Sequence, residues 1–546
     1  MSSVIEEKKI NADTSQPFSE ALVVGAGFAG LYMLHRLRGL GISARVLEAG
    51  DGVGGTWYWN RYPGARCDVE SMEYSYQFSE ELQQEWEWTE RYATQPEILR
   101  YLEHVSERFD LLRDIQFNTR VQSADFDQNE SKWCVETSSG QTFSCQFLVM
   151  ATGCLSSVNT PHFEGMSDFS GSCYHTGHWP HEPIDFTGRR VAIIGTGSSA
   201  IQSIPVIAEQ AKMLHVFQRT PNFSIPAGNR PLEESYVQEV KSRYPEFRAE
   251  GRSQGFGIVD PFPPSAHADP ERIPTRQEVE ESLQERWDYG GITFLNGVPG
   301  LTTDPALNEL AADFVRRKIR EEVSDPEVAD ALSPSTMVGC KRLCVDTNYF
   351  STYNRSNVKL VDISQSPIDK IVPEGVSVSG KVYACDDLIL ATGFDAMTGA
   401  LSKVEIKGRE GLTLADKWKE GPRTYLGLAT EGFPNLFIVT GPGSPSVLSN
   451  MVQSIEQHVE WISDCMVYMK RAGLVRIEPK FDAEEEWVTH VNELADQTIF
   501  PTCNSWYLGA NVPGKPRVFM PYLGFPPYVE ICRDVADSEY KGFQLA

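Results

Sequence analysis

Two short glycine-rich loops constrain the fold of this chain more than any other feature. The first, Gly25-Ala26-Gly27-Phe28-Ala29-Gly30, follows the apolar run 21–24 and precedes a helical pattern of leucines. The second, Gly195-Thr196-Gly197-Ser198-Ser199-Ala200, follows the apolar run 191–194 and also precedes a helical pattern. A further apolar run comes after each helix, at 44–50 and at 213–217. This repeated order of strand, tight turn, helix and strand predicts an α/β fold with two Rossmann-like dinucleotide-binding domains.

The residues after the second strand of each unit indicate two different nucleotides. Glycines in the turn let backbone N–H groups approach a pyrophosphate, whose charge the helix N-terminus favours. In the first unit, the Glu48 carboxylate is suited to accept hydrogen bonds from ribose hydroxyls and to repel a 2′-phosphate, so we expect FAD or NAD there. The second unit has Gln218-Arg219-Thr220 at this place, and a guanidinium donates paired hydrogen bonds to a phosphate. The second unit is therefore predicted to bind NADPH.

Two similar segments predict where the chain passes between the domains. FLVMATG at 147–153 and DDLILATGFD at 386–395 each look like a strand that runs into a glycine turn. The region from about 231 to 335 is charged and contains two amphipathic helical patterns, which indicates a helical insertion. The expected organisation is a flexible lead at 1–18, an FAD domain at 19–155 and 386–546, and an NADPH domain at 156–385 with its insertion at about 225–340.

Composition narrows the class of partner. The chain has 546 residues, enough for two or three domains, and a formal net charge of −26, which disfavours nucleic acids and anionic membranes. It has no apolar run long enough for a bilayer and no apolar stretch typical of a secretory signal, so we expect a cytoplasmic protein without membrane contact, as a monomer or weak homo-oligomer. The 11 cysteines are scattered and predict free buried thiols and no metal site.

Two nucleotides in one chain imply hydride transfer from NADPH to FAD. A disulfide reductase would place two cysteines close to the flavin, but the helical pattern after the first loop contains none. The remaining electron acceptor is O2, with or without an organic substrate.

A motif just before the second glycine loop carries a family resemblance. Residues 169–180, FSGSCYHTGHWP, match the pattern FxGxxxHxxxWP at Phe169, Gly171, His175, Trp179 and Pro180. This pattern resembles the fingerprint of type I Baeyer–Villiger monooxygenases, although His181 stands where many members have Asp. Segments such as GGTWYWNRYPGARCDVES, GPGSPSVLSNM and NSWYLGANVPGKPRVFMPY are similar to the branch with phenylacetone and steroid monooxygenases, and the resemblance covers about residues 20–545. It implies a ketone substrate that gains one oxygen atom from O2 and becomes an ester or lactone.

The same resemblance assigns residues to roles. Arg342 would be the catalytic arginine, since a fixed buried cation stabilises negative charge that develops during oxygen insertion, and Asp68 would pair with it. Ser446, Val447 and Leu448 would line the substrate pocket, while His175 and Trp179 would have structural roles. Besides the two loops, the predicted cofactor-binding residues are Glu48, Gly55, Thr56, Trp57, Asp68, Tyr74, Val121, Met451, Gln202, Arg219, Thr220, Lys341 and Trp506, with Lys341 on the 2′-phosphate and Trp506 in a mobile loop over the nicotinamide.

Two other functions remain open at this point. The first is a different flavin monooxygenase chemistry, such as N- or S-oxygenation, which an assay for ester or lactone products would distinguish. The second is a non-enzymatic class, an FAD-binding redox sensor or partner protein, which would consume only traces of NADPH with every ketone.

Overall fold

The computed structural model describes residues 18–262 and 274–546, so the lead expected at 1–18 lies outside the described residues except for Phe18. The first glycine loop lies at the centre of an eight-stranded sheet, where β1 runs parallel to β2 and β6. The sheet order is β17-β4-β5-β6-β1-β2-β3, and β18 pairs with β6. Its strands are β1 (Phe18–Val24), β2 (Ala44–Leu47), β3 (Ile115–Gln116), β4 (Val121–Asp127), β5 (Lys132–Thr137), β6 (Thr142–Met150), β17 (Glu405–Lys407) and β18 (Leu436–Ile438).

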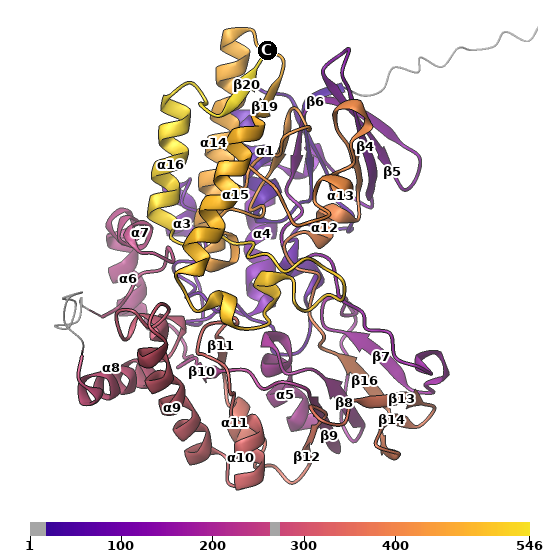
Figure 1. The fold of residues 1–546 in the computed structure, drawn as a ribbon, viewed down its shortest axis with the longest axis vertical. Helices are drawn as coiled ribbons and strands as arrows, with labels where there is room; N and C mark the ends of the chain where they lie inside the picture. Colours follow the sequence, from indigo (N-terminus) through magenta and orange to yellow (C-terminus); the bar gives the residue numbers. More distant parts are fainter. Residues whose placement is uncertain (1–17, 263–273) are drawn as a thin grey trace, which may run out of the picture.

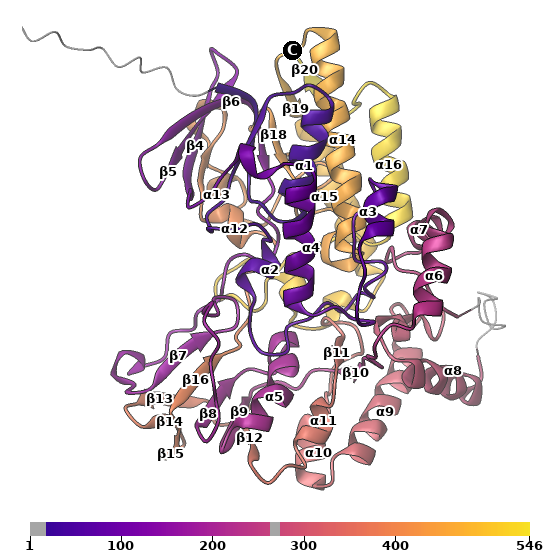
Figure 2. The ribbon, with the colours of Figure 1, turned by 180° about the vertical axis from the view of Figure 1, so that it is seen from behind.

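Helices from both ends of the chain cover this sheet. The apolar face of α1 packs against α14, the long helix near the C-terminus, and α16 packs against α14 in turn (Figures 1 and 2). The Asn450 side chain caps the start of α14, and Gly473 ends it in a left-handed conformation. The elements are α1 (Phe28–Gly39), α2 (Thr56–Trp59), α3 (Glu80–Glu85), α4 (Gln95–Arg108), α12 (Gly399–Ser402), α13 (Leu414–Lys417), α14 (Met451–Ala472), β19 (Ile477–Pro479), α15 (Phe481–Asp496), α16 (Phe525–Asp537) and β20 (Phe543–Leu545).

The second glycine loop belongs to a separate five-stranded sheet, which Figure 1 shows below the first. All four neighbouring pairs in the order β12-β9-β8-β16-β7 are parallel. The α/β class with two Rossmann-like units is confirmed. The elements of this part are β7 (Ser172–His175), β8 (Arg190–Ile194), α5 (Ser198–Gln210), β9 (Met213–Gln218), α11 (Tyr349–Thr352), β12 (Val358–Asp362), β13 (Ile368–Val372), β14 (Gly375–Val378), β15 (Lys381–Ala384) and β16 (Asp387–Leu390).

The expected return to the first domain at residue 386 is wrong by one strand, because β16 pairs with β8 and β7 in the second sheet. The segments 147–153 and 386–395 each contain the residues Ala-Thr-Gly (ATG) after a strand, and each of these ATG segments packs against the glycine loop of its own sheet. A Cβ atom on Gly25 would lie 2.6 Å from the Ala151 carbonyl oxygen, and one on Gly195 would lie 2.4 Å from that of Ala391. The two segments are equivalent in structure, and the second therefore belongs to the second domain. The chain leaves that domain only after Leu390.

The helical insertion lies between β10 and β11, which pair in parallel. The two amphipathic patterns form α8 and α9, and this part of the prediction is confirmed. Arg248 of α7 reaches the first domain, where it donates to the Glu73 carbonyl and the Ser75 hydroxyl. The elements are β10 (Ser224–Pro226), α6 (Glu234–Ser242), α7 (Tyr244–Ser253), α8 (Arg276–Tyr289), α9 (Pro305–Glu322), α10 (Pro326–Leu332) and β11 (Cys344–Asp346). Short 3₁₀ turns complete the described fold at Leu112–Asp114, Met166–Asp168, Ile292–Asn296, Arg409–Gly411, Ser446–Leu448, Phe500–Thr502 and Trp506–Leu508.

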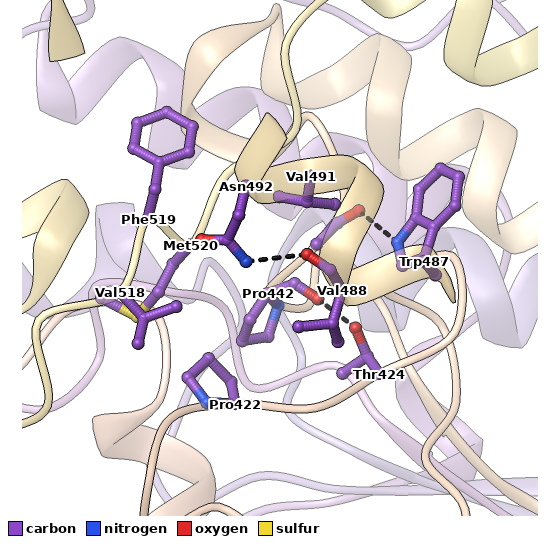
Figure 3. A pocket seen from close by; sticks show the side chains of 11 residues that line it. Pro422, Thr424, Pro442, Trp487, Val488, Val491, Asn492, Val518, Phe519 and Met520 are labelled. Atoms are coloured by element: carbon purple, nitrogen blue, oxygen red, sulfur yellow. Dashed lines mark hydrogen bonds between the residues drawn. The ribbon is translucent and has the colours of Figure 1, made fainter. Parts of the chain in front are cut away.

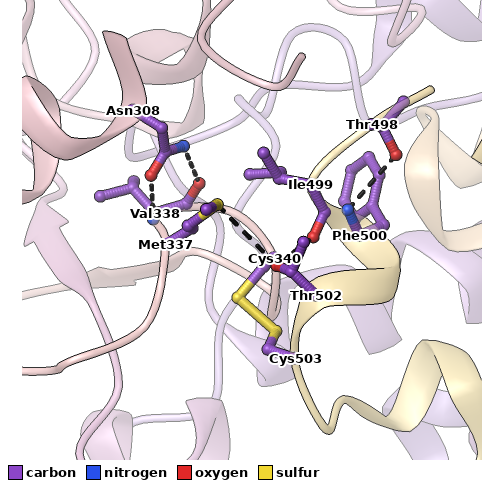
Figure 4. Close-up of a disulfide and its surroundings, with 9 residues drawn as sticks. All are labelled: Asn308, Met337, Val338, Cys340, Thr498, Ile499, Phe500, Thr502 and Cys503. Atoms are coloured by element: carbon purple, nitrogen blue, oxygen red, sulfur yellow. Dashed lines mark hydrogen bonds between the residues drawn. A yellow bond between two sulfur atoms is a disulfide. The ribbon is translucent and has the colours of Figure 1, made fainter. Parts of the chain in front are cut away.

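A disulfide joins Cys340, at the end of the insertion, to Cys503 (Figure 4). Cys503 lies in the segment after α15, residues 497–524. The expectation that all thiols are free is wrong for this pair. The two cysteines are 163 residues apart in sequence, yet their Cα atoms are 6.1 Å apart, so spacing alone could not reveal the pairing. Asn308 of α9 holds Val338, which lies two residues before Cys340. The Asn308 side chain exchanges two hydrogen bonds with the Val338 backbone. The disulfide thus ties a fixed edge of the insertion to the C-terminal part.

Among the described residues, no helix combines the length and the apolar character needed to cross a bilayer.

The disulfide sets the number of thiols that should react before and after reduction. The sequence contains 11 cysteines, of which nine lie outside the disulfide. Purified protein, denatured without reductant, should therefore react with nine equivalents of a thiol reagent, and with eleven after reduction. The Cys503→Ser variant should release one more thiol without reductant, because Cys340 loses its partner. Eleven reactive thiols in unreduced wild type would contradict the pairing.

A buried glutamate, Glu456, should make the free energy of unfolding depend on pH. Glu456 of α14 is 7% exposed, and its Oε1 accepts the N–H groups of Gln77 and Phe78. Burial raises its pKa to about 8, against an ordinary value of 4.5. Between these two values the unfolded chain loses a proton that the folded chain keeps, so the free energy of unfolding falls as pH rises.

Glu456→Gln keeps the acceptor oxygen and removes the ionisation. We expect it to raise Tm at pH 8.5 by a few degrees, roughly the effect of 1 kcal/mol or more, and to change Tm little at pH 4.5. Differential scanning fluorimetry at both pH values measures this. Glu460→Gln, one turn further along α14, controls for the loss of an acid from the helix. Equal Tm changes for both variants across pH would contradict the assignment.

Candidate functional site

The first glycine loop forms a backbone cradle at the N-terminus of α1. Gly25 ends β1 in the left-handed region, with a φ of 106°, and its N–H donates to the Leu47 carbonyl. Gly27 faces Gly55 so closely that a Cβ atom on Gly55 would lie 2.9 Å from the Gly27 Cα. A Cβ on Gly30 would lie 1.8 Å from the Gly25 carbonyl oxygen. Only glycines fit these contacts, and such a tight turn at the N-terminus of α1 is suited to a pyrophosphate.

Glu48 lies at the end of β2, directly beside this cradle. Its Oε2 accepts the Ala26 N–H at 2.7 Å, and its Oε1 accepts the Gly50 N–H at 2.7 Å. The side chain is 4% exposed. A carboxylate has about four acceptor positions, so both oxygens can still accept hydrogen bonds from ribose hydroxyls. Thr119 donates its N–H to the Glu48 carbonyl, which brings Val121, two residues later, to the same edge of the sheet.

Aromatic side chains continue the cradle toward the second domain. The Trp57 Nε1–H donates to the Tyr74 hydroxyl at 3.2 Å, and the Phe28 and Tyr74 rings make an edge contact at 5.3 Å. Thr56 is the exposed first residue of α2, just after Gly55. Met451 is the half-buried first residue of α14 and packs on the same core. The structure thus brings most of the residues predicted for FAD to one face of the first unit.

The second loop repeats the geometry of the first. Gly195 has a φ of 114°, and its N–H donates to the Phe217 carbonyl, as Gly25 does to Leu47. Gly197 caps α5, and Ala200, which is fully buried, replaces the third glycine. The Thr196 hydroxyl donates to the Thr220 carbonyl at 3.1 Å and holds the loop against the end of β9.

Two further residues predicted for the coenzyme make polar contacts within the protein. The Ser199 hydroxyl contacts that of Thr176 at 3.2 Å. The Gln202 side chain bridges to the first domain, since its Oε1 accepts the Tyr62 hydroxyl and its Nε2 donates to the Arg66 carbonyl. Gln202 therefore lies at the contact between the two domains.

Two basic side chains gather beside the second loop. Arg219 directly follows β9, and Lys341 lies at the end of the insertion, just before β11. Burial lowers the pKa of Lys341, and the positive charge of Arg219 lowers it further, so the two cations lie close together. Within residues 18–262 and 274–546, no carboxylate lies within ion-pair distance of either one. Two neighbouring cations without a carboxylate fit a bound phosphate dianion.

Arg342 forms the centre of the site. Its Nε and Nη2 donate to the Asp68 Oδ2 at 3.1 and 2.7 Å, and its Nη1 donates to the Val447 carbonyl at 2.8 Å. The Arg342 and Asp68 side chains are 21% and 28% exposed. Burial alone would lower the pKa of Arg342, but the Asp68 carboxylate and the Tyr507 side chain outweigh it and raise this pKa. The guanidinium is thus a permanent cation with a fixed orientation.

The predicted pocket residues lie against this arginine. Ser446, Val447 and Leu448 form a buried 3₁₀ turn just before α14, and the Val447 carbonyl is the one that Arg342 contacts. The Ser446 hydroxyl lies 4.0 Å from the Met397 sulfur, and the Met397 N–H donates to the Cys154 carbonyl. The wall of the site is therefore apolar and polarisable, with one cation at its edge.

The fingerprint residues have structural surroundings. His175 ends β7; its Nδ1 accepts the Gly177 N–H at 3.0 Å, and its Nε2 lies 3.4 Å from the Asn159 carbonyl oxygen. Burial lowers the pKa of His175, which favours the neutral imidazole that these contacts require. Trp179 is 6% exposed and packs on Tyr174. Both arrangements fit the structural roles that the sequence predicts.

The segment after α15 closes one side of the site. Trp506 is half-buried, and its ring lies 4.3 Å from that of Tyr507. The Asn511 side chain donates to the Phe394 carbonyl, and the Lys515 Nζ lies 2.6 Å from the Asp395 Oδ1. Sequence reasoning singled out Trp506 and gave no role to its direct neighbour Tyr507, to Asn511 or to Lys515. The fold places Tyr507 close enough to Arg342 to raise the pKa of the arginine.

A small cavity behind this segment is too small for a substrate. Figure 3 shows it between α15 and the segments around Pro442 and Met520. Its volume of about 10 Å³ suits one water molecule. The Gly443 N–H donates to the Met520 carbonyl, and this hydrogen bond holds the C-terminal segment against the first domain. In the same described ranges, no group of three His, Cys, Asp or Glu side chains is placed to hold a metal ion.

Comparisons with known proteins agree with this geometry. A family model described as pyridine nucleotide-disulphide oxidoreductase matches residues 22–243, although α1 contains no cysteine. A Baeyer–Villiger monooxygenase of Pseudooceanicola batsensis is 41% identical over 509 residues, which cover 92% of each chain. A phenazine N-monooxygenase of Lysobacter antibioticus is 40% identical over 98% of each chain.

A solved structure of an oxidised steroid monooxygenase bound to NADP is 51% identical, with a TM-score of 0.92. The match covers 97% of this chain and 99% of that one. The similarity at this level covers nearly the whole length of both chains. The chain belongs to the family of type I Baeyer–Villiger monooxygenases.

Proposed function

We propose that this protein takes electrons from NADPH onto FAD and uses O2 to insert one oxygen atom next to a ketone carbonyl, giving an ester or lactone. The observation that carries this proposal is the Arg342 guanidinium, fixed between the Asp68 carboxylate and the Val447 carbonyl. It lies where both nucleotide-binding units and the apolar pocket wall meet. A permanent cation at this place suits a reaction in which a neutral carbonyl oxygen becomes negative.

The first unit would hold FAD. Its glycine cradle suits the pyrophosphate and Glu48 the ribose, while residues from Gly55 to Trp57, Tyr74, Val121 and Met451 would surround the rest. FAD, when bound, supplies hydride acceptance and reaction with O2. The pair of Lys341 and Arg219 would hold the 2′-phosphate of NADPH, with Thr220 beside it and Trp506 over the nicotinamide end.

Arg342 would donate hydrogen bonds to the substrate oxygen as its negative charge develops. Asp68 would keep the guanidinium oriented and would not itself transfer a proton, because its Oδ2 accepts both the Nε and the Nη2 of Arg342. The apolar wall of Val447 and Leu448 would exclude water from the reacting atoms. Exclusion of water strengthens the effect of the cation on the transition state.

The identity of the product tests this proposal. Linear, cyclic and steroidal ketones are incubated with FAD-loaded protein, NADPH and ¹⁸O2, and products are identified by mass spectrometry. An ester or lactone with one ¹⁸O atom supports the proposal. Complete absence of such products, with NADPH consumption at background, would favour a redox sensor.

N-oxygenation is the second candidate, because a phenazine N-monooxygenase is 40% identical over nearly the full length. A heteroaromatic amine such as a phenazine is added to the same panel. An N-oxide without any ester product would make this the function of the protein and overturn the proposal of ketone oxygenation.

Removal of the cation should separate the two half-reactions. In Arg342→Ala, we expect NADPH to reduce the flavin at nearly the wild-type rate, and ester formation to fall by about 100- to 1,000-fold. Stopped-flow flavin reduction and product yield measure the two steps. Arg320→Ala, which removes an exposed arginine of α9, is the matched control and should leave both unchanged. Intact ester formation in Arg342→Ala would refute the catalytic role.

Loss of the predicted phosphate ligand should change coenzyme preference. In Arg219→Ala, we expect the KM for NADPH to rise by about 10- to 100-fold, since a charged hydrogen bond contributes roughly 1.5–3 kcal/mol. The KM for NADH should change little, because NADH lacks the 2′-phosphate. Steady-state kinetics with both coenzymes measure this, with Arg355→Ala as the control on the same domain. An equal rise for both coenzymes would mean that Arg219 does not contact the phosphate.

A further inference from the structure

The two crossings between the domains lie side by side. The chain passes from the first sheet to the second through residues 157–159 and returns through residues 393–395, and these stretches form a short antiparallel pair, the paired crossings. The Asn159 N–H donates to the Gly393 carbonyl at 3.0 Å, and the Asp395 N–H donates back to the first crossing at 2.8 Å. The paired crossings thus fix how the chain enters and leaves the second domain.

The fingerprint strand packs against the paired crossings. The His175 Nε2 lies 3.4 Å from the Asn159 carbonyl oxygen and 3.3 Å from the Thr392 hydroxyl, which itself donates to that carbonyl at 2.7 Å. A Cβ atom on Gly177 would lie only 2.5 Å from the Val158 side chain. The backbone of Asn159 is therefore held both by the opposite crossing and by the fingerprint strand.

The segment after α15 is docked on the paired crossings by polar side chains. The Asn159 Nδ2 donates to the Asn511 carbonyl at 2.9 Å, and the Asn511 Nδ2 donates to the Phe394 carbonyl at 2.6 Å. Four residues after Asn511, the Lys515 Nζ lies 2.6 Å from the Asp395 Oδ1 and donates to the carbonyl of the next residue at 2.8 Å. The segment is thus bound to both crossings, and Asn159 supplies the contact from the first of them.

Hydrogen bonds within the segment connect Asn511 to the turn that carries Trp506. The Ala510 N–H donates to the Ser505 carbonyl at 3.0 Å. The Gly509 N–H donates to the Trp506 carbonyl at 3.0 Å. These bonds close a compact turn that ends directly before Asn511, so a displacement of Asn511 would also displace Trp506.

We propose that Asn159 is a positioning residue for the coenzyme: together with Asn511, it docks the segment after α15 on the paired crossings and so holds Trp506 in place. The inference rests on the proposed function, in which Trp506 lies over the nicotinamide end of NADPH. Lys341 and Arg219 would hold the 2′-phosphate at the other end without this segment. Loss of the docking contact should therefore weaken the binding of coenzymes with and without that phosphate.

Asn159→Ala removes the amide that holds the Asn511 carbonyl. In FAD-loaded protein, we expect hydrogen–deuterium exchange of residues 505–517 to become faster by about threefold or more, and the Kd for NADP+ to rise roughly fivefold, as for one lost hydrogen bond. The Kd for NAD+ should rise by the same factor. Mass spectrometry and equilibrium titration measure these changes. Asn354→Ala is the matched control, because its exposed amide donates to the Glu322 carbonyl at 2.8 Å.

Exchange in α5 shows whether each variant is folded, and it should stay at the wild-type rate. If it rises in Asn159→Ala, Asn511→Ala is judged by the same criteria, because it removes the second docking bond, to Phe394. Exchange of residues 505–517 no faster than in Asn354→Ala would overturn the inference, as would an unchanged Kd or a rise confined to NADP+. These measurements need no turnover, so they decide the inference whether or not a ketone is oxygenated.

Discussion

The partial burial of one guanidinium, that of Arg342, constrains how the segments of the site come together. A charged group that leaves water requires partners for its hydrogen-bond donors, and an unpaired buried charge is strongly destabilising. Arg342 finds its partners on segments that are far apart in sequence, at Asp68 and at Val447. Each of these segments must therefore be in its place before the cation is satisfied. The same requirement assembles the site, because the pocket wall and both nucleotide loops border these segments.

The two nucleotide-binding units show how nearly the same backbone serves different ligands. Both loops begin with a left-handed glycine packed on the carbonyl of an ATG segment. In the first loop, the Glu48 carboxylate binds the N–H of Ala26 and so becomes part of the turn itself. In the second loop, the Thr196 hydroxyl fulfils this task through the Thr220 carbonyl. No carboxylate is then needed at the end of β9, and the place is free for Arg219.

Local features were predictable from the sequence, whereas features that depend on distant contacts were not. The glycine loops, Glu48 and the helices α8 and α9 follow from spacing, chain chemistry and hydrophobic pattern, and the structure has them as expected. The boundary at 386 failed because one ATG segment looks like the other, and only strand pairing assigns it to a sheet. The Cys340–Cys503 pair joins positions that are 163 residues apart in sequence. The roles of Arg342, Asp68 and Lys341 came from family resemblance, since a Lys-Arg pair alone is usually a solvated surface feature.

The negative charge of the chain gives the basic residues of the site a particular meaning. With a formal net charge of −26, the long-range field repels anionic ligands, so an anionic coenzyme must be captured by local cations. Lys341 and Arg219 lie together without a carboxylate in the described parts of the chain, and burial together with the charge of Arg219 lowers the pKa of Lys341. Their repulsion is a cost of folding that a bound phosphate would relieve. Arg342, adjacent to Lys341 in sequence, is instead neutralised by Asp68. Lys341 therefore remains available for a ligand, whereas Arg342 is held in a fixed orientation for the reaction.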